Sequence, residues 1–206
     1  MAWYDLVEKK LMPDDKIIND NIRFDKFMIK NKIVIESIEA ICFSLPKENE
    51  QIRIITQKRF NAFALVKWLV DNLEEIEQIF LTSYRVDEMT LNGITEILNE
   101  REVKKLTIVC SAFFTSVKKK EPSAERLKYL ANTDSRVKAI FCHNHTKIIG
   151  IKTKDTAYVI EGSGNLTGNA RIEQYMIEKS NEIFEFHKKW IDELVEKPKQ
   201  VQIYGN

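Results

Sequence analysis

The chain has 206 residues, 44% of them hydrophobic, so it can bury one substantial core. Its 32 basic and 31 acidic residues leave a net charge of +1, which excludes the strongly basic class of proteins that bind nucleic acid indiscriminately. The N-terminal residues contain no apolar run fit for a signal peptide or a membrane span, and the three cysteines lie in apolar stretches. We therefore expect a cytoplasmic protein with reduced core thiols and no membrane contact.

Strand-like and helix-like segments alternate along the chain, which is typical of an α/β fold. Short apolar runs predict the strands, and apolar residues at helical spacing predict the helices. The predicted strands are residues 33–43, 52–56, 78–84, 105–110, 137–142, 143–151, 157–161 and 171–177. The predicted helices are residues 60–76, 87–99, 123–131 and a last helix from Ser180 or Asn181 that buries Ile183, Phe184, Phe186, Trp190 and Leu194.

One dense basic run, Lys118-Lys119-Lys120, follows the predicted strand 105–110. A run of like charges is usually a solvated loop. Its position after a strand that we expect to end beside the active site also makes these lysines candidate substrate contacts.

A set of polar residues near the predicted strand 143–151 points to phosphate diester chemistry. His145-Thr146-Lys147 is followed by fourteen residues and then by Gly162-Ser163-Gly164-Asn165. An imidazole can attack phosphorus and leave later, which splits one difficult displacement into two easier ones. An ammonium and an amide nitrogen can hold the phosphoryl oxygens as negative charge develops on them. Together these residues predict a phosphodiesterase site.

This pattern resembles the HxK…GSxN signature of the phospholipase D superfamily, and Leu166-Thr167 continues it as in that family. The resemblance implies a mixed β-sheet flanked by helices on both faces, with one motif per chain. It also implies cleavage through a phosphohistidine, without metal or other cofactor. The implied roles are His145 as nucleophile and general acid, Lys147 and Asn165 as ligands of the phosphoryl oxygens, Ser163 as their support, and Glu173 as the residue that orients the imidazole.

The sequence departs from the family pattern at one position. The family commonly has Asp where this chain has Lys152, and the nearest acid is Asp155. Asp155 keeps the usual gap to Gly162, so we interpret it as a structural residue in a hairpin at 153–155.

The run Cys142-His143-Asn144-His145 also invites a metal-site interpretation. The other candidate ligands are Cys42, Cys110 and His187, and they lack the paired spacings of structural zinc sites. We therefore predict no metal site. On a strand, His143 would point the same way as His145 and Lys147, so it either lines the rim of the cleft as a substrate contact or is a hydrogen-bonded structural residue.

The resemblance is closest to the single-motif bacterial endonuclease branch, including the end-helix pattern from Phe186 to Asp192. It assigns residues 51–196 to a catalytic domain, with an extension of unclear role at 1–50 and a tail at 197–206. Since the family's active site combines two HxK halves and this sequence has one, we expect a homodimer. The expected function is a nuclease acting on DNA or RNA. A phospholipase and a non-catalytic dimer that binds nucleic acid are the alternatives.

Overall fold

The expected alternation of strands and helices is confirmed by a computed structural model, which describes residues 22–24, 27–31, 44–56, 60–115, 121–168, 171–196 and 201–205. The predicted strand 33–43 lies outside these residues. The strands are β1 Ile22–Phe24, β2 Phe27–Asn31, β3 Gln51–Thr56, β4 Ile76–Thr82, β5 Val103–Ser111, β6 Val137–Cys142, β7 Ile148–Thr153, β8 Ala157–Gly162, β9 Glu173–Lys179 and β10 Gln202–Tyr204. The helices are α2 Phe63–Asp71, α3 Glu88–Glu100, the 3₁₀ helix η1 Ala112–Thr115, α4 Pro122–Thr133 and α5 Asn181–Glu196.

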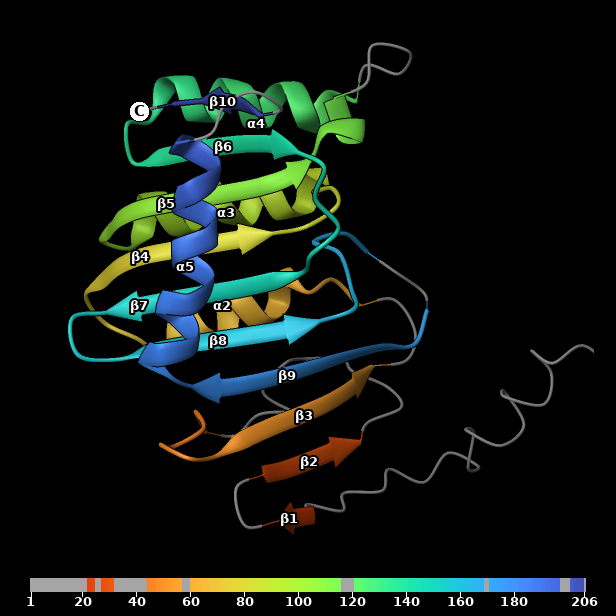
Figure 1. Ribbon diagram of the computed structural model, residues 1–206, viewed down its shortest axis with the longest axis vertical. Helices are drawn as coiled ribbons and strands as arrows, with labels where there is room; N and C mark the ends of the chain where they lie inside the picture. Colours follow the sequence, from red (N-terminus) through yellow and green to blue (C-terminus); the bar gives the residue numbers. More distant parts are fainter. Residues whose placement is uncertain are drawn as a thin grey trace, which may run out of the picture.

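All described strands join one mixed sheet in the order β1-β2-β3-β9-β8-β7-β4-β5-β6-β10 (Figure 1). β4, β5 and β6 are parallel, whereas β7, β8 and β9 alternate in direction. As a result, the carboxyl ends of β3, β4, β5, β6 and β8 lie at one edge of the sheet, together with the amino ends of β7 and β9. We call this edge the motif edge, because the residues of the sequence motif lie there.

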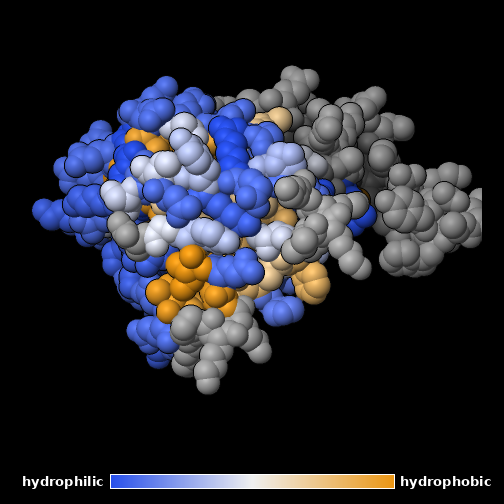
Figure 2. All heavy atoms as spheres, turned by 90° about the horizontal axis from the view of Figure 1, so that it is seen from above, coloured by the Kyte–Doolittle hydropathy of each residue, from blue (hydrophilic) through white to orange (hydrophobic). Residues whose placement is uncertain are grey.

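Helices cover both faces of the sheet, which confirms the predicted fold class. On one face α2, α3 and α4 bury apolar side chains that include Leu65, Leu91 and Leu127. On the other face α5 crosses the sheet and packs Phe184 and Ile191 against apolar side chains of β4 to β8 (Figure 1). The outer surface on the side of α4 and β10 is mostly hydrophilic, with small apolar patches (Figure 2).

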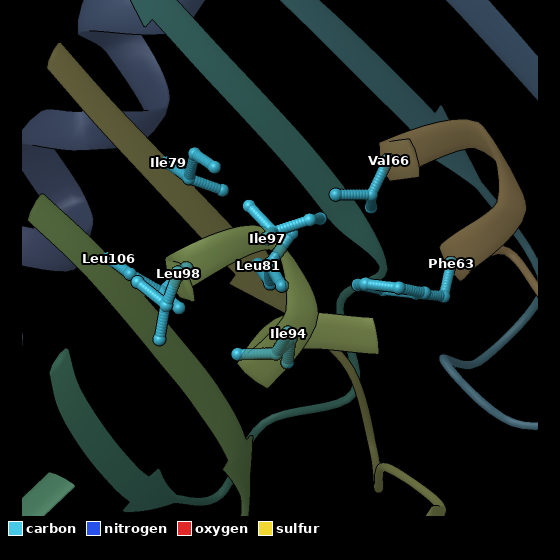
Figure 3. Close-up of a pocket in the computed structure, with 8 residues that line it drawn as sticks. All are labelled: Phe63, Val66, Ile79, Leu81, Ile94, Ile97, Leu98 and Leu106. Carbon is cyan, nitrogen blue, oxygen red and sulfur yellow. The ribbon is translucent and has the colours of Figure 1, made fainter. Parts of the chain in front are cut away.

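A small apolar cavity of about 10 Å³ lies between α2, α3 and the sheet (Figure 3). Its lining contains Phe63 and Val66 from α2, Ile94 from α3, and Leu81 from β4, all apolar. A space of this size without polar groups is a packing gap of the core rather than a binding site for a polar ligand.

In the last helix Phe184 is buried as predicted, and Ile183, Trp190 and Leu194 are partly buried. Ile191 is buried although it was not predicted. The helix departs from the prediction most at Phe186. Its start is correct, since the Ile183 backbone N–H donates to Ser180 Oγ at 3.1 Å. Phe186, however, is 64% exposed. Phe184 faces the sheet, and a residue two positions later is turned by about 200° around the helix, so Phe186 points away from the core. His187 is buried instead. Its Nδ1 accepts from Trp190 Nε1 at 3.1 Å, and its Nε2 therefore donates to Glu161 Oε1 at 2.7 Å.

The motif segment also differs from the prediction. Residues 143–147 form a loop, and β7 begins only at Ile148. The reason is topological: β6 and β7 are separated in the sheet by β5 and β4, so the chain has to cross the ends of those two strands before it can enter β7. A segment of that kind cannot continue β6 as a strand.

Both ends of the described chain add strands to the sheet. β1 and β2 extend it beside β3, and β10 pairs antiparallel with β6. Cys110 and Cys142 are buried and unpaired, as expected, whereas Cys42 lies outside the described residues. Within those residues no helix combines the length and apolar character needed to span a bilayer.

Candidate active site

Three neighbouring strands bring the residues of the sequence motif together at the motif edge. His145 and Lys147 precede β7, Ser163 and Asn165 follow β8, and Glu173 is the first residue of β9. Because β7, β8 and β9 lie side by side, the segment before β7, the segment after β8 and the start of β9 meet in space. The basic run Lys118-Lys119-Lys120 lies outside the described residues.

The loop before β7 is held by Asn144, whose side chain is buried. Its Nδ2 donates to Ser83 O at 3.1 Å and to Val109 O at 3.3 Å. These carbonyl groups lie near the carboxyl ends of β4 and β5, which the loop crosses. Its Oδ1 accepts from the Thr146 backbone N–H at 3.0 Å and from Thr146 Oγ1 at 2.6 Å. With Asn144 turned inward, His143 and His145 on either side of it are exposed.

Lys147 contacts His145 directly. Its Nζ lies 2.9 Å from His145 Nδ1 and 2.6 Å from the His145 carbonyl oxygen. An ammonium has only donors, so Nδ1 accepts, and a neutral ring then carries its proton on Nε2. Partial burial lowers the pKa of Lys147, and the negative charge of Glu173 opposes this shift. The pair therefore presents a positive charge beside an oriented imidazole.

Ser163 links the loop after β8 to β9. Its Oγ donates to Glu173 Oε2 and accepts from the Gln174 backbone N–H at 3.0 Å, and its own backbone N–H donates to Gln174 O at 3.0 Å. Glu173 is buried at 8% exposure. Its contact with Ser163 fixes the carboxylate at the motif edge, while the expected orientation of His145 by Glu173 stays a prediction.

Asn165 is oriented by the residues that follow β4. Its Oδ1 accepts from the Tyr84 backbone N–H at 3.1 Å and from Ser83 Oγ at 3.4 Å. This leaves the Nδ2 amide hydrogens as the donors of the side chain. The Tyr84 ring meets the imidazole of His145 edge to face, with centroids 5.6 Å apart.

Sequence reasoning did not find Ser83 and Tyr84. A usable signal exists, because both come directly after the parallel strand β4, and ligand sites of α/β sheets lie at the carboxyl ends of the strands.

Two glycines of the motif are required by the ring of Tyr175 on β9. A Cβ on Gly162 would lie 2.4 Å from Tyr175 Cδ1, and one on Gly164 would lie 1.9 Å from Tyr175 Oη. The Tyr175 hydroxyl is buried and has no hydrogen-bond partner, and burial together with the charge of Glu173 raises its pKa. The sequence motif gives no indication of this contact, because Tyr175 lies outside it on β9.

Lys152, where the sequence departs from the family pattern, and Asp155, the nearest acid, both lie away from the site. Lys152 is near the end of β7, where its Nζ donates to Glu185 Oε1 of α5 at 2.5 Å. Asp155 is exposed in the hairpin between β7 and β8, and this hairpin lies at the predicted residues 153–155. From Ile148 to Lys152 the strand extends about 13 Å, so the loss of an acid at residue 152 leaves the residues at the motif edge unchanged.

His143 lies at the motif edge beside Phe113 of η1, with ring centroids 5.4 Å apart at 79°. It is exposed, which fits the rim position better than a buried structural role. Among the residues that the structure describes, no group of three or more His, Cys, Asp or Glu side chains is arranged to hold a metal ion.

The comparisons with known proteins add little to this geometry. No protein-family model matches the sequence, and no curated protein does. Among solved structures, the chain is similar to phosphatidylserine synthase from Haemophilus influenzae Rd KW20, with a TM-score of 0.46 and 10% sequence identity. The match covers 74% of this chain but 39% of that one, so this chain spans about two fifths of the synthase. Similarity at this level carries no information about the substrate.

Proposed function

We propose that the protein is a phosphodiesterase of the phospholipase D type, and that its substrate is DNA or RNA. The observation that carries the proposal is the convergence of His145, Lys147, Ser163, Asn165 and Glu173 at one edge of the sheet, although they come from three separate segments. The exposed imidazole of His145 can act as a nucleophile, and the ammonium of Lys147 beside it can bind the phosphate group that is attacked.

In the proposed reaction Lys147 Nζ leaves His145 Nδ1 for a phosphoryl oxygen, which frees an unprotonated ring nitrogen. This nitrogen attacks phosphorus and forms a P–N bond while the bond to the leaving oxygen breaks. His145 of a second copy of this chain gives its proton to that oxygen. Water then attacks the phosphohistidine, the second imidazole takes the water proton, and the P–N bond breaks. Because this sequence holds one copy of the motif, a homodimer with one shared site supplies the second imidazole.

The other side chains serve the charge that develops on phosphorus. Lys147 Nζ, which contacts His145, and Asn165 Nδ2, whose amide is oriented by the Tyr84 backbone, bind the non-bridging oxygens as donors. Ser163 supports their binding through Glu173, because its hydroxyl proton is donated to Glu173 Oε2. Glu173 balances the positive charges of the site and orients the imidazole. The set contains a nucleophile, an acid and charge stabilisation, so the chemistry needs no bound cofactor.

The direct test is hydrolysis of bis-p-nitrophenyl phosphate, followed by release of p-nitrophenolate in the presence and absence of EDTA. We expect the rate to be the same in both, because imidazole, ammonium and amide supply the roles that a metal ion would otherwise have. Loss of activity in EDTA that added divalent cations restore would contradict the phosphohistidine mechanism. Cleavage of phospholipid vesicles but not of oligonucleotides would identify the phospholipase alternative instead.

The pH dependence of phosphate binding should report on Lys147. Burial lowers its pKa, so binding of inorganic phosphate weakens as the pH rises through a value below the ordinary lysine range. Glu173→Gln removes the charge that opposes this shift, and the loss of binding should move to still lower pH. Titration calorimetry across pH measures this without turnover. Glu178→Gln, at the other end of β9, is the matched control and should leave the pH profile of phosphate binding unchanged. Equal profiles for the wild type and both variants would contradict the influence of Glu173 on the pKa of Lys147.

A further inference from the structure

We propose that Phe113 and His143 form a stacking site for an unpaired nucleobase, so that the protein acts on single-stranded rather than duplex nucleic acid. The inference rests on the proposed function and names the form of its substrate. It starts from one unusual feature, an aromatic side chain that is 61% exposed at the motif edge.

Phe113 is held outward by its neighbour in η1. Phe114 is buried at 4% exposure and packs against Phe141 of β6, with centroids 6.4 Å apart. The turn is closed by hydrogen bonds from the Phe113 backbone N–H to Ser111 Oγ and from Thr115 Oγ1 to Ala112 O. Since Phe114 packs into the core, Phe113 is held on the solvent side. Folding has already restricted its conformation, so a ligand that binds to it loses less conformational entropy.

A chain of contacts connects Phe113 to the proposed nucleophile. The Phe113 ring meets His143 edge to face, and His143 is separated from His145 only by the anchored Asn144. Two residues of chain span at most about 7 Å, so His143, and with it the stacking site, belongs to the same short loop as the imidazole that attacks phosphorus. On the other side, the Ser111 backbone N–H donates to Tyr84 O at 3.1 Å, and the Tyr84 ring contacts His145.

The chemistry of this surface fits a base. An edge-to-face ring pair leaves ring surface open, and every nucleobase has a π-face that can stack on it. A base inside a duplex is already stacked and paired, so it reaches Phe113 only after it is unpaired. The net charge of +1 gives the chain little overall attraction to phosphate, so stacking contacts would add to its binding of a single strand.

The test measures binding apart from catalysis, using the His145→Asn protein and fluorescein-labelled 12-mers in fluorescence anisotropy. The probes are a single-stranded DNA, the same sequence as a duplex, and a single strand in which every nucleotide is abasic. We expect the normal single strand to bind about 5- to 100-fold more tightly than the abasic one, from stacking of one base. Adding Phe113→Ala should remove most of that difference and leave binding of the abasic strand unchanged.

Two control variants separate stacking from other effects. Phe113→Leu keeps an apolar side chain but lacks a π-face, so it should behave like Phe113→Ala. Tyr129→Ala removes an aromatic residue of α4 that is 70% exposed, and it should bind all probes as the parent does. Equal binding of normal and abasic strands, preference for the duplex, or no effect of Phe113→Ala would overturn the inference. Phe113-dependent binding to anionic lipid vesicles but not to single strands would overturn it in favour of a lipid site.

The failure of this inference and that of the proposed function give different results. If the protein with His145 intact cleaves no diester, yet base stacking depends on Phe113, the enzyme proposal fails and the stacking site stands. If oligonucleotides are cleaved and Phe113→Ala changes neither KM nor binding, the stacking site fails alone.

Discussion

His145→Asn is expected to lower phosphodiester hydrolysis by at least about a thousandfold, because it removes the nucleophile and the general acid together from a shared site. Binding of nucleic acid should survive, since Lys147 and Asn165 still offer their donors to phosphate. The measurement is kcat/KM on bis-p-nitrophenyl phosphate next to anisotropy with a labelled oligonucleotide. His187→Asn is the matched control with the same substitution, because His187 is a buried residue of α5 and contacts Glu161 rather than the motif residues.

The same variant tests the proposed dimer. Light scattering of the wild type should give about twice the chain mass of 24.2 kDa. When wild-type and His145→Asn chains exchange in equal amounts, about one quarter of the dimers carry two imidazoles, and activity should fall to that fraction. Activity that falls only to one half would mean that each chain works alone. If the wild type hydrolyses no diester and binds nucleic acid as well as the variant does, the site is a binding surface.

The sequence was sufficient for the elements with strong apolar patterns. The predicted strand 137–142 coincides with β6, and Asp87 caps α3 at the predicted helix start, accepting from the Thr90 backbone N–H at 2.9 Å. These elements are determined locally, by side-chain periodicity and by capping. The mixed sheet with helices on both faces followed from their alternation and from the family resemblance.

The loop of residues 143–147 could not be predicted in the same way. Its shape depends on the strand order, which places β5 and β4 between β6 and β7, and on the inward turn of Asn144 toward Ser83 O and Val109 O. A local pattern contains neither. For the same reason sequence analysis found the five polar motif residues but missed three aromatic residues whose contacts with them are made by the fold. These are Tyr84 after β4, Phe113 of η1 and Tyr175 of β9.

Gly164→Ala is expected to destabilise the protein by about 1–3 kcal/mol and to reduce hydrolysis strongly, because the new Cβ would overlap the Tyr175 hydroxyl at 1.9 Å. Gly164 lies between Ser163 and Asn165, so a shift of the backbone that relieves the overlap also moves both side chains. Urea unfolding and kcat/KM on bis-p-nitrophenyl phosphate measure the two effects.

A second variant shows whether Tyr175 is the cause. Tyr175→Phe alone should be neutral or slightly stabilising, since the hydroxyl it removes is buried without a hydrogen-bond partner. In the Tyr175→Phe background Gly164→Ala should cost less than in the wild type, because the nearest remaining ring atom is Cζ at 2.9 Å. Gly150→Ala is the control, since its Cβ would meet Phe80 at 2.1 Å and Tyr175→Phe should not relieve that overlap. Additive effects at Gly164 and Tyr175 would show that the tyrosine does not set the conformation of this loop, whereas a rescue confined to Gly164 would identify Tyr175 as the residue that positions Ser163 and Asn165.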